Sequence, residues 1–200
     1  MRRISLFAED FGHEAVLVPL IVRVADQYGV EVKVRPVSVR AGFPRVAAEL
    51  SQYVKDLLRF RETLPDLVVV ATDANCGGFR QRRADLAEPA KLICDHVVYA
   101  VPDPHIERWL LRDPAAFKAV LGVACDPPDQ KCDRDRYKNL LIHAVCDAGA
   151  TPLLGGLEYA EDIVGHMDLG PTTRGDDFGD FLQELHGRFR LWTAAEERDP

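Results

Sequence analysis

Residues 66–75 of the chain read Asp-Leu-Val-Val-Val-Ala-Thr-Asp-Ala-Asn, and this stretch decides the predicted fold. The apolar run over residues 67–71 is unbroken and rich in β-branched residues, which is typical of a strand buried on both faces of a parallel sheet. Asp73 and Asn75 follow where the strand ends. Because ligand-binding groups of open parallel sheets collect at the carboxyl ends of the strands, we expect a functional site here.

Strand and helix patterns alternate on both sides of this run. The predicted strands cover residues 3–8, 30–39, 66–72 and 95–101. Amphipathic helical patterns separate them, which gives the order β-α-β-α-β-α-β. This alternation predicts an α/β fold with a doubly wound, Rossmann-like parallel sheet flanked by helices. Pro36 argues against a central place for the second strand, since proline cannot donate a ladder hydrogen bond.

The second half of the chain is predicted to be helical. Its helical patterns cover residues 106–112, 114–121, 137–148, 157–167 and 178–189. We expect these helices to pack on the sheet, so that residues 1–200 form one domain. In that domain residues 1–103 make the α/β core, and residues 104–193 make a helical extension packed on it.

The composition narrows the classes of function. The chain has 200 residues, of which 47% are hydrophobic and 28% charged, which suits one globular domain with a full core. A net charge of −7 excludes a generally basic nucleic-acid binder, so any nucleic-acid contact needs a local basic patch. No apolar run approaches the roughly 18 residues that span a membrane, and no apolar signal-peptide segment follows Met1. We therefore expect a cytoplasmic protein without membrane contact.

The five cysteines form no Cys-x-x-Cys pair. They are Cys76, Cys94, Cys125, Cys132 and Cys146. This odd number and irregular spacing favour a cytosolic protein with reduced thiols. A zinc site made of Cys125, Cys132, His143 and Cys146 stays open as an alternative, although its spacing matches no common zinc pattern.

A second acidic group follows the first predicted strand. Glu9 lies at the strand end, and Asp10 and Glu14 share one face if the next helix begins near Asp10. Carboxylates brought together repel each other unless a cation lies between them. The alternative is an acidic first helical turn, which the helix dipole favours. His13, inside this motif, is either an acid–base group or a capping and packing residue.

The two strand ends together predict a metal site. If the first and third strands are neighbours, Glu9 faces Asp73 and Asn75 across the carboxyl edge of the sheet. Their oxygen atoms suit Mg²⁺ or Mn²⁺, which can activate water and neutralise charge on a phosphate. The alternative is that Asp73 caps the following helix and Asn75 forms a turn.

The layout of the chain resembles a Toprim domain, which carries an acidic residue after the first strand and Asp-x-Asp after a later strand. Three segments carry a closer resemblance, to one family of Toprim-like proteins. The segments are residues 6–14, 70–75 and 101–113. The third contains Glu107-Arg108-Trp109-Leu110-Leu111-Arg112-Asp113, the most distinctive of the three. Over most of its length the chain resembles an uncharacterised family of small stand-alone Toprim-like proteins. These are related to overcoming-lysogenization-defect (OLD) nucleases and are often encoded beside an AAA-type ATPase.

This resemblance implies a Toprim-like fold and a metal-dependent nuclease that cleaves phosphodiester bonds of DNA or RNA. It implies that Glu9, Asp73 and Asn75 bind Mg²⁺ or Mn²⁺. It implies a catalytic set of Glu9, Asp73, Glu14 and Glu107, in which the last two are supporting residues. It also implies a role in bacterial defence with an ATPase partner. Without a catalytic role, Glu107 would cap or brace its own helix.

The chain departs from the family pattern at both acidic motifs. Asp10 stands where the family commonly has Gly, and one extra residue precedes Glu14. Asn75 replaces the second Asp of Asp-x-Asp, which removes a negative charge and weakens metal binding. Two alternatives therefore stay open. One is a binding or regulatory subunit that does not cleave, and the other is a phosphotransfer enzyme acting on a small nucleotide.

Arginines around the same predicted edge are candidates to hold the phosphates of DNA or RNA. They are Arg40, Arg45, Arg80, Arg82 and Arg83. The alternative is a solvated helix face in which Asp85 and Glu88 balance the arginine charges.

Overall fold

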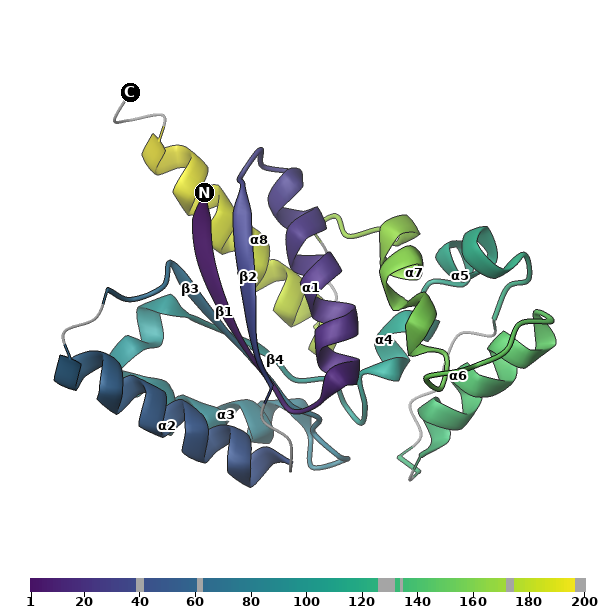
Figure 1. Cartoon of the computed structure of the whole chain (residues 1–200), viewed down its shortest axis with the longest axis horizontal. Helices are drawn as coiled ribbons and strands as arrows, with labels where there is room; N and C mark the ends of the chain where they lie inside the picture. The colour runs from purple at the N-terminus through teal and green to yellow at the C-terminus, as the bar shows by residue number, and fades with distance from the viewer. Residues whose placement is uncertain (39–41, 61–62, 126–131, 134, 172–174, 197–200) are drawn as a thin grey trace.

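The chain folds into one parallel sheet with helices on both faces, as a computed structural model shows (Figure 1). The structure describes residues 1–38, 42–60, 63–125, 132–133, 135–171 and 175–196. The strands are β1 (Arg2–Ala8), β2 (Val32–Ser38), β3 (Leu67–Ala71) and β4 (Val97–Ala100). Their order in the sheet is β2-β1-β3-β4, and each neighbouring pair is parallel. The predicted α/β class is confirmed.

The position of β3 follows from its sequence. It lies between β1 and β4, and all five of its side chains are fully buried. An unbroken apolar run is stable there because helices cover both faces of the strand. β1 pairs directly with β3, as the predicted metal site required, and Pro36 lies on β2, which is an edge strand.

The helices match the predicted patterns closely. They are α1 (Phe11–Asp26), α2 (Phe43–Phe60), α3 (Phe79–Ala90), α4 (Glu107–Leu111), α5 (Pro114–Leu121), α6 (Arg136–Asp147), α7 (Ala160–His166) and α8 (Asp177–Glu196), with 3₁₀ turns η1 (Lys91–His96) and η2 (Leu157–Tyr159). The last helix runs beyond the predicted residue 189. The added turns pack Trp192 against Phe189 and place its ring under the guanidinium of Arg2. Within the described residues, none of the helices is long and apolar enough to cross a membrane.

Two apolar layers enclose the sheet (Figure 1). On one face α2 and α3 pack against the sheet, and α2 buries Val46, Leu50, Val54 and Leu57 at helical spacing. On the other face α1 and α8 pack against the sheet, and α4 to α7 extend this layer beside α1. The second half of the chain therefore shares a continuous core with the first.

A buried carboxylate, Asp177, joins the start of α8 to the segment that follows β4. It is 5% exposed and accepts hydrogen bonds from the Asp103 backbone N–H at 2.8 Å and from Trp109 Nε1 at 2.9 Å. Arg108 donates to it at 3.1 Å. This network fixes the course of the chain at the carboxyl end of β4, where the candidate site lies.

We expect Asp177→Ala to lower the free energy of unfolding by about 3 kcal/mol, because it removes the carboxylate partner of the mostly buried Arg108 and the acceptor of the Trp109 Nε1 and Asp103 N–H groups. Urea denaturation measures the change. The matched control is Asp85→Ala, which removes an exposed carboxylate bonded to Gln81 and should cost less than about 0.5 kcal/mol. Equal losses in the two variants would contradict this account.

Candidate functional site

The carboxyl ends of β1, β3 and β4 meet at one edge of the sheet, and hydrogen bonds continue beyond the strands. The Glu9 N–H donates to Ala71 O at 3.1 Å, and the Thr72 N–H donates to Ala100 O at 3.2 Å. The Ala74 N–H donates to Pro102 O at 2.8 Å. Three chain segments are therefore held side by side, and the side chains that follow each strand come together.

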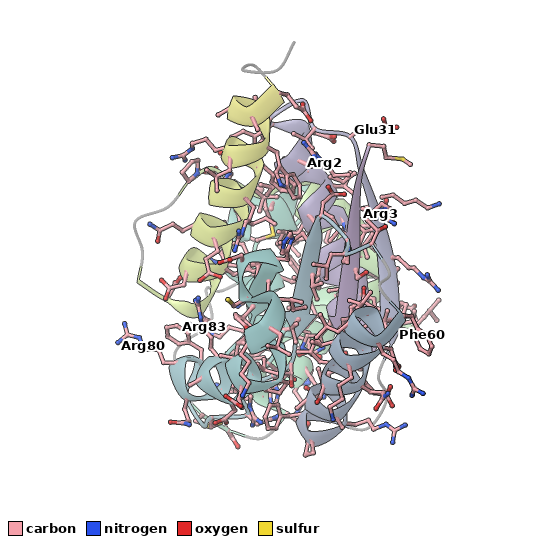
Figure 2. The ribbon with its side chains drawn as sticks, turned by 90° about the vertical axis from the view of Figure 1, so that its left-hand side faces the viewer. Arg2, Arg3, Glu31, Phe60, Arg80 and Arg83 are labelled. Atoms are coloured by element: carbon pink, nitrogen blue, oxygen red, sulfur yellow. A yellow bond between two sulfur atoms is a disulfide. The ribbon has the colours of Figure 1, made fainter. Side chains whose placement is uncertain are left out.

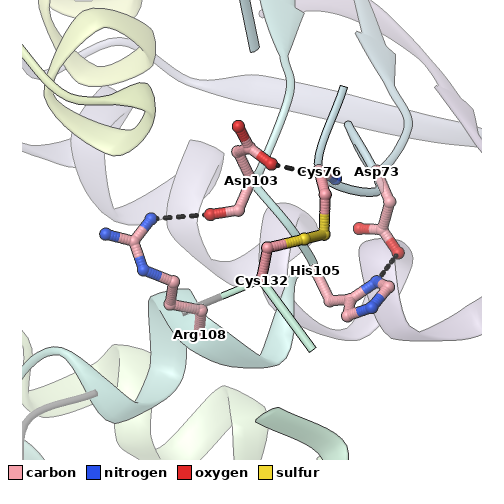
Figure 3. Close-up of a disulfide and its surroundings, with 6 residues drawn as sticks. All are labelled: Asp73, Cys76, Asp103, His105, Arg108 and Cys132. Carbon is pink, nitrogen blue, oxygen red and sulfur yellow. Dashed lines mark hydrogen bonds and ion pairs between the residues drawn. A yellow bond between two sulfur atoms is a disulfide. The ribbon is translucent and has the colours of Figure 1, made fainter. Parts of the chain in front are cut away.

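Asp73 is the centre of this edge. It is 6% exposed, and its Oδ1 accepts the Ile106 N–H at 3.1 Å. His105 Nδ1 lies 3.0 Å from its Oδ2, as Figure 3 shows. His13 Nε2 lies 3.2 Å from Oδ1, which is within ion-pair distance although not aligned as a hydrogen bond. Both carboxylate oxygens are thus engaged by groups of the chain itself.

His13 reaches Asp73 because of how α1 begins. Asp10 is the N-cap of α1, and its Oδ1 accepts the backbone N–H of His13 at 3.1 Å. The same oxygen lies 2.8 Å from His13 Nδ1. The fully buried imidazole therefore lies between two carboxylates, those of Asp10 and Asp73.

These contacts shift the pKa values of the two carboxylates, Asp10 and Asp73, and of the two histidines, His13 and His105. Burial alone would lower the pKa of His13, but the charges and hydrogen bonds of Asp73 and Asp10 outweigh it and raise the pKa to about 10. Burial would raise the pKa of Asp10, but its hydrogen bonds with His13 and the charge of His13 outweigh burial and lower the pKa to about 2. Burial would likewise raise the pKa of Asp73, but His13 and His105 lower it. The hydrogen bond with Asp73 raises the pKa of His105. At neutral pH Asp73 is ionised and His13 is cationic.

Glu9 points from the end of β1 toward β3. Its Oε2 accepts the Asp73 backbone N–H at 3.0 Å and also the Thr72 hydroxyl. Glu9 therefore braces the backbone that carries Asp73.

Glu107, the first residue of α4, is 5% exposed, and its Oε2 has no hydrogen-bond partner within the described residues. Burial raises the pKa of Glu107, and the negative charge of Asp73 raises it further. Its carboxyl group therefore belongs to the electrostatic environment of Asp73.

Two predicted site residues lie elsewhere. Glu14 lines a groove between α1 and α7, together with Phe11 and Leu157. Asn75 is exposed, has a left-handed backbone with φ of 49°, and donates its backbone N–H to Pro104 O. The structure brings Glu9, Asp73 and Glu107 to one site and leaves Glu14 and Asn75 outside it.

The predicted arginine cluster is spread over several partners. Arg82 lies over the Phe43 ring at 3.9 Å, and Arg45 pairs with Glu49 at 2.6 Å. Arg83 pairs with Glu184, whereas Asp85 bonds Gln81 and Glu88 bonds Lys91. Figure 2 shows Arg80 pointing away from the molecule. Arg40 lies outside the described residues. Asp85 and Glu88, expected from sequence to balance the arginine charges, therefore bond other residues of α3 and η1 directly.

The expectation of reduced thiols is wrong for one pair. Cys76 and Cys132, 56 residues apart, form a disulfide beside Asp103, Asp73 and His105 (Figure 3). Cys132 is thus not available to the alternative zinc site, and His143 is exposed on α6. No spacing rule in the sequence indicates a bond between residues so far apart.

The predicted magnesium or manganese site is not preformed among the described residues. The described parts of the chain contain no group of three or more His, Cys, Asp or Glu side chains placed to hold a metal ion. The physical reason is that two histidines and a backbone N–H engage both oxygens of Asp73, while Asn75 is exposed. The residues present therefore do not fit a divalent cation without rearrangement.

Sequence reasoning missed His105, the closest polar partner of Asp73 Oδ2. The available signal was its position, five residues after the end of β4 at the carboxyl edge of a parallel sheet. His13 was considered, but its contact with Asp73 depends on the pairing of β1 with β3 and on the capped start of α1.

No family model, curated protein or solved structure matches this chain. The resemblance to Toprim-like proteins therefore stays a prediction.

The raised pKa of His13 predicts how stability depends on pH. The pKa of His13 is 6.5 in the unfolded chain and about 10 in the folded protein. His13 therefore stabilises the folded protein fully below pH 6.5, and this stabilisation is lost as the pH rises through about 10. The free energy of unfolding should therefore fall between about pH 6.5 and pH 10.

Urea denaturation across this pH range measures the effect, with His13→Gln expected to flatten the decline. His166→Gln changes an exposed histidine and is the matched control. Wild-type protein and His13→Gln with the same slope would contradict the placement of His13 between two carboxylates.

Proposed function

We propose that this chain hydrolyses phosphodiester bonds of DNA or RNA at the Asp73 site. The observation that carries the proposal is the buried Asp73–His105 pair at the carboxyl edge of the sheet. The Toprim resemblance supplies the class of reaction, and the geometry supplies the residues that would perform it.

In the proposed reaction His105 is the general acid. Asp73 accepts the hydrogen bond of Nδ1 and raises the pKa of the ring, which favours the imidazolium form. Nε2 has no hydrogen bond or ion pair within the described residues and can carry the acidic proton. As water attacks phosphorus and the bond to the leaving oxygen breaks, His105 protonates that oxygen.

The proton released by the attacking water needs an acceptor, and Glu107 supplies it in this proposal. Burial raises the pKa of Glu107 toward the range in which a carboxylate is an effective base, and its Oε2 has no hydrogen-bond partner within the described residues. The charge of Lys138 acts on both His105 and Glu107. In this proposal Lys138 and the His13 cation counter the negative charge of the phosphate.

A metal-dependent nuclease, with Mg²⁺ or Mn²⁺ as the resemblance implies, is the second candidate. One observation favours it. Within the described residues the buried Glu107 Oε2 lacks a partner, and burial together with the charge of Asp73 raises the pKa of Glu107; a bound cation would counter both effects. The histidine contacts of Asp73 oppose it, because a cation would have to displace one of them.

Other implications of the resemblance stay proposals. They are an AAA-type ATPase partner, a role in bacterial defence and a cytoplasmic location; the Cys76–Cys132 disulfide opposes the last of these. A binding or regulatory subunit gains support from the exposed position of Asn75. Phosphotransfer to or from a small nucleotide also stays open.

Cleavage of supercoiled plasmid and single-stranded RNA tests the proposal, with Mg²⁺, Mn²⁺ or EDTA present. We expect His105→Gln and Asp73→Asn each to slow cleavage by about 10²- to 10⁴-fold, the usual contribution of general acid–base catalysis. The rate should fall as the pH rises through the raised pKa of His105, because the acid loses its proton. Asp85→Asn, an exposed change on α3, is the control for unchanged activity.

The outcomes separate the candidates. Cleavage that persists in EDTA and is lost in His105→Gln supports acid–base hydrolysis. Cleavage that requires Mg²⁺ or Mn²⁺ and is lost in Asp73→Asn but retained in His105→Gln selects the metal-dependent candidate. No cleavage by folded wild-type protein contradicts both and favours the regulatory subunit.

A further inference from the structure

A second hollow, lined by both basic and apolar residues, lies toward the start of β1, away from the Asp73 site. It is a groove of 430 Å³ between the β1–β2 side of the sheet, the second half of α2, and Thr63 and Pro65. Its polar lining residues are Arg3, Ser5, Lys33, Arg35, Tyr53 and Thr63.

Strand register places these positive side chains on one face. Arg3 pairs with Lys33 and Ser5 pairs with Arg35 in parallel strands, and paired residues point to the same side of the sheet. The next pair on this face, Phe7 and Val37, packs into the apolar layer under α2. The face is therefore apolar where α2 covers it and basic where α2 leaves it open.

The basic residues of the groove are poorly compensated. Lys33 and Arg35 are exposed and form no ion pair within the described residues. Arg3 donates from Nη2 to Leu64 O at 3.1 Å, which is a neutral acceptor. Asp66, the nearby carboxylate, bonds Arg2 and the backbone N–H of Arg3, and the charge of Arg3 also acts on it. Arg3 is therefore partly compensated, in contrast to Lys33 and Arg35. Adjacent like charges on neighbouring strands repel each other, and an anion in the groove would relieve this repulsion.

Protection of the sheet edge explains only part of this arrangement. Charged residues on an edge strand prevent unwanted strand pairing, and β2 is such a strand. Arg3, however, lies on β1, which has partners on both sides. The hydroxyl groups of Ser5 and Tyr53 lie 3.4 Å apart in the same hollow and offer further hydrogen bonds to a ligand.

We propose that this groove binds phosphate groups of a nucleotide or a nucleic acid. Guanidinium groups pair with phosphate oxygens through two parallel hydrogen bonds, and lysine and hydroxyl groups add single contacts. Glu9 lies six residue steps beyond Arg3, a distance of about 20 Å along an extended strand, so the groove is a binding site distinct from the Asp73 site. The inference does not depend on cleavage there.

Fluorescence anisotropy of a short labelled single-stranded oligonucleotide tests the proposal, with the full chain and with EDTA present. We expect the variant Lys33→Gln/Arg35→Gln to bind the oligonucleotide more weakly. The slope of log Kd against log salt concentration should also be smaller by about 1.4, which is the value for two lost phosphate contacts on a single strand. The matched control is Lys55→Gln/Arg59→Gln, which removes the same charge from exposed positions of α2 that do not line the groove.

Competition identifies the source of the phosphate. Displacement of the oligonucleotide by a mononucleotide and by inorganic phosphate supports a small phosphate ligand, and resistance to both supports a polynucleotide ligand. The proposal is overturned if wild-type protein binds none of these, if the groove and control variants lose affinity equally, or if a polyglutamate peptide competes as well as the nucleic acid does.

Discussion

A carboxylate buried at the end of a parallel strand must be compensated by positive charge or by hydrogen-bond donors. In this chain the requirement falls on Asp73, and the surrounding structure meets it. His13 comes from α1, and His105 with the Ile106 N–H comes from the segment after β4. Each contact fixes a segment that follows a strand, so the buried charge of Asp73 sets the geometry of the carboxyl edge formed by β1, β3 and β4.

This compensation limits the chemistry that Asp73 can support. The oxygens that face the histidines are the same oxygens that a divalent cation would need, so acid–base chemistry and metal binding compete for one carboxylate. Glu107 is buried, and its Oε2 has no hydrogen-bond partner within the described residues. Its proposed role differs between the two mechanisms: it accepts a proton in acid–base hydrolysis and lies beside a cation in the metal-dependent reaction. At the other end of β1 lies the groove lined by Arg3, Lys33 and Arg35, where we propose that phosphate groups bind.

Sequence patterns predicted the parts of the structure that depend on local or repetitive signals. The β-branched run of β3 could be stable only in a sheet covered on both faces, and helical spacing located α2 by its buried stripe. The neighbourhood of β1 and β3 followed from the alternation of elements. The contacts of His13 and His105 with Asp73 could not be read in the same way, because they depend on the capped start of α1 and on the path of the chain after β4. The Cys76–Cys132 bond likewise joins loops that no periodic pattern relates.

The most direct measurement is an NMR pH titration of the imidazole resonances of His13 and His105 in wild-type protein and in Asp73→Asn. If Asp73 holds both rings in their charged form, both should titrate above pH 6.5 in the wild type, His13 near pH 10. Both titrations should move to lower pH in the variant. Wild-type titration of His105 at or below pH 6.5, unchanged in Asp73→Asn, would contradict the central place given to Asp73.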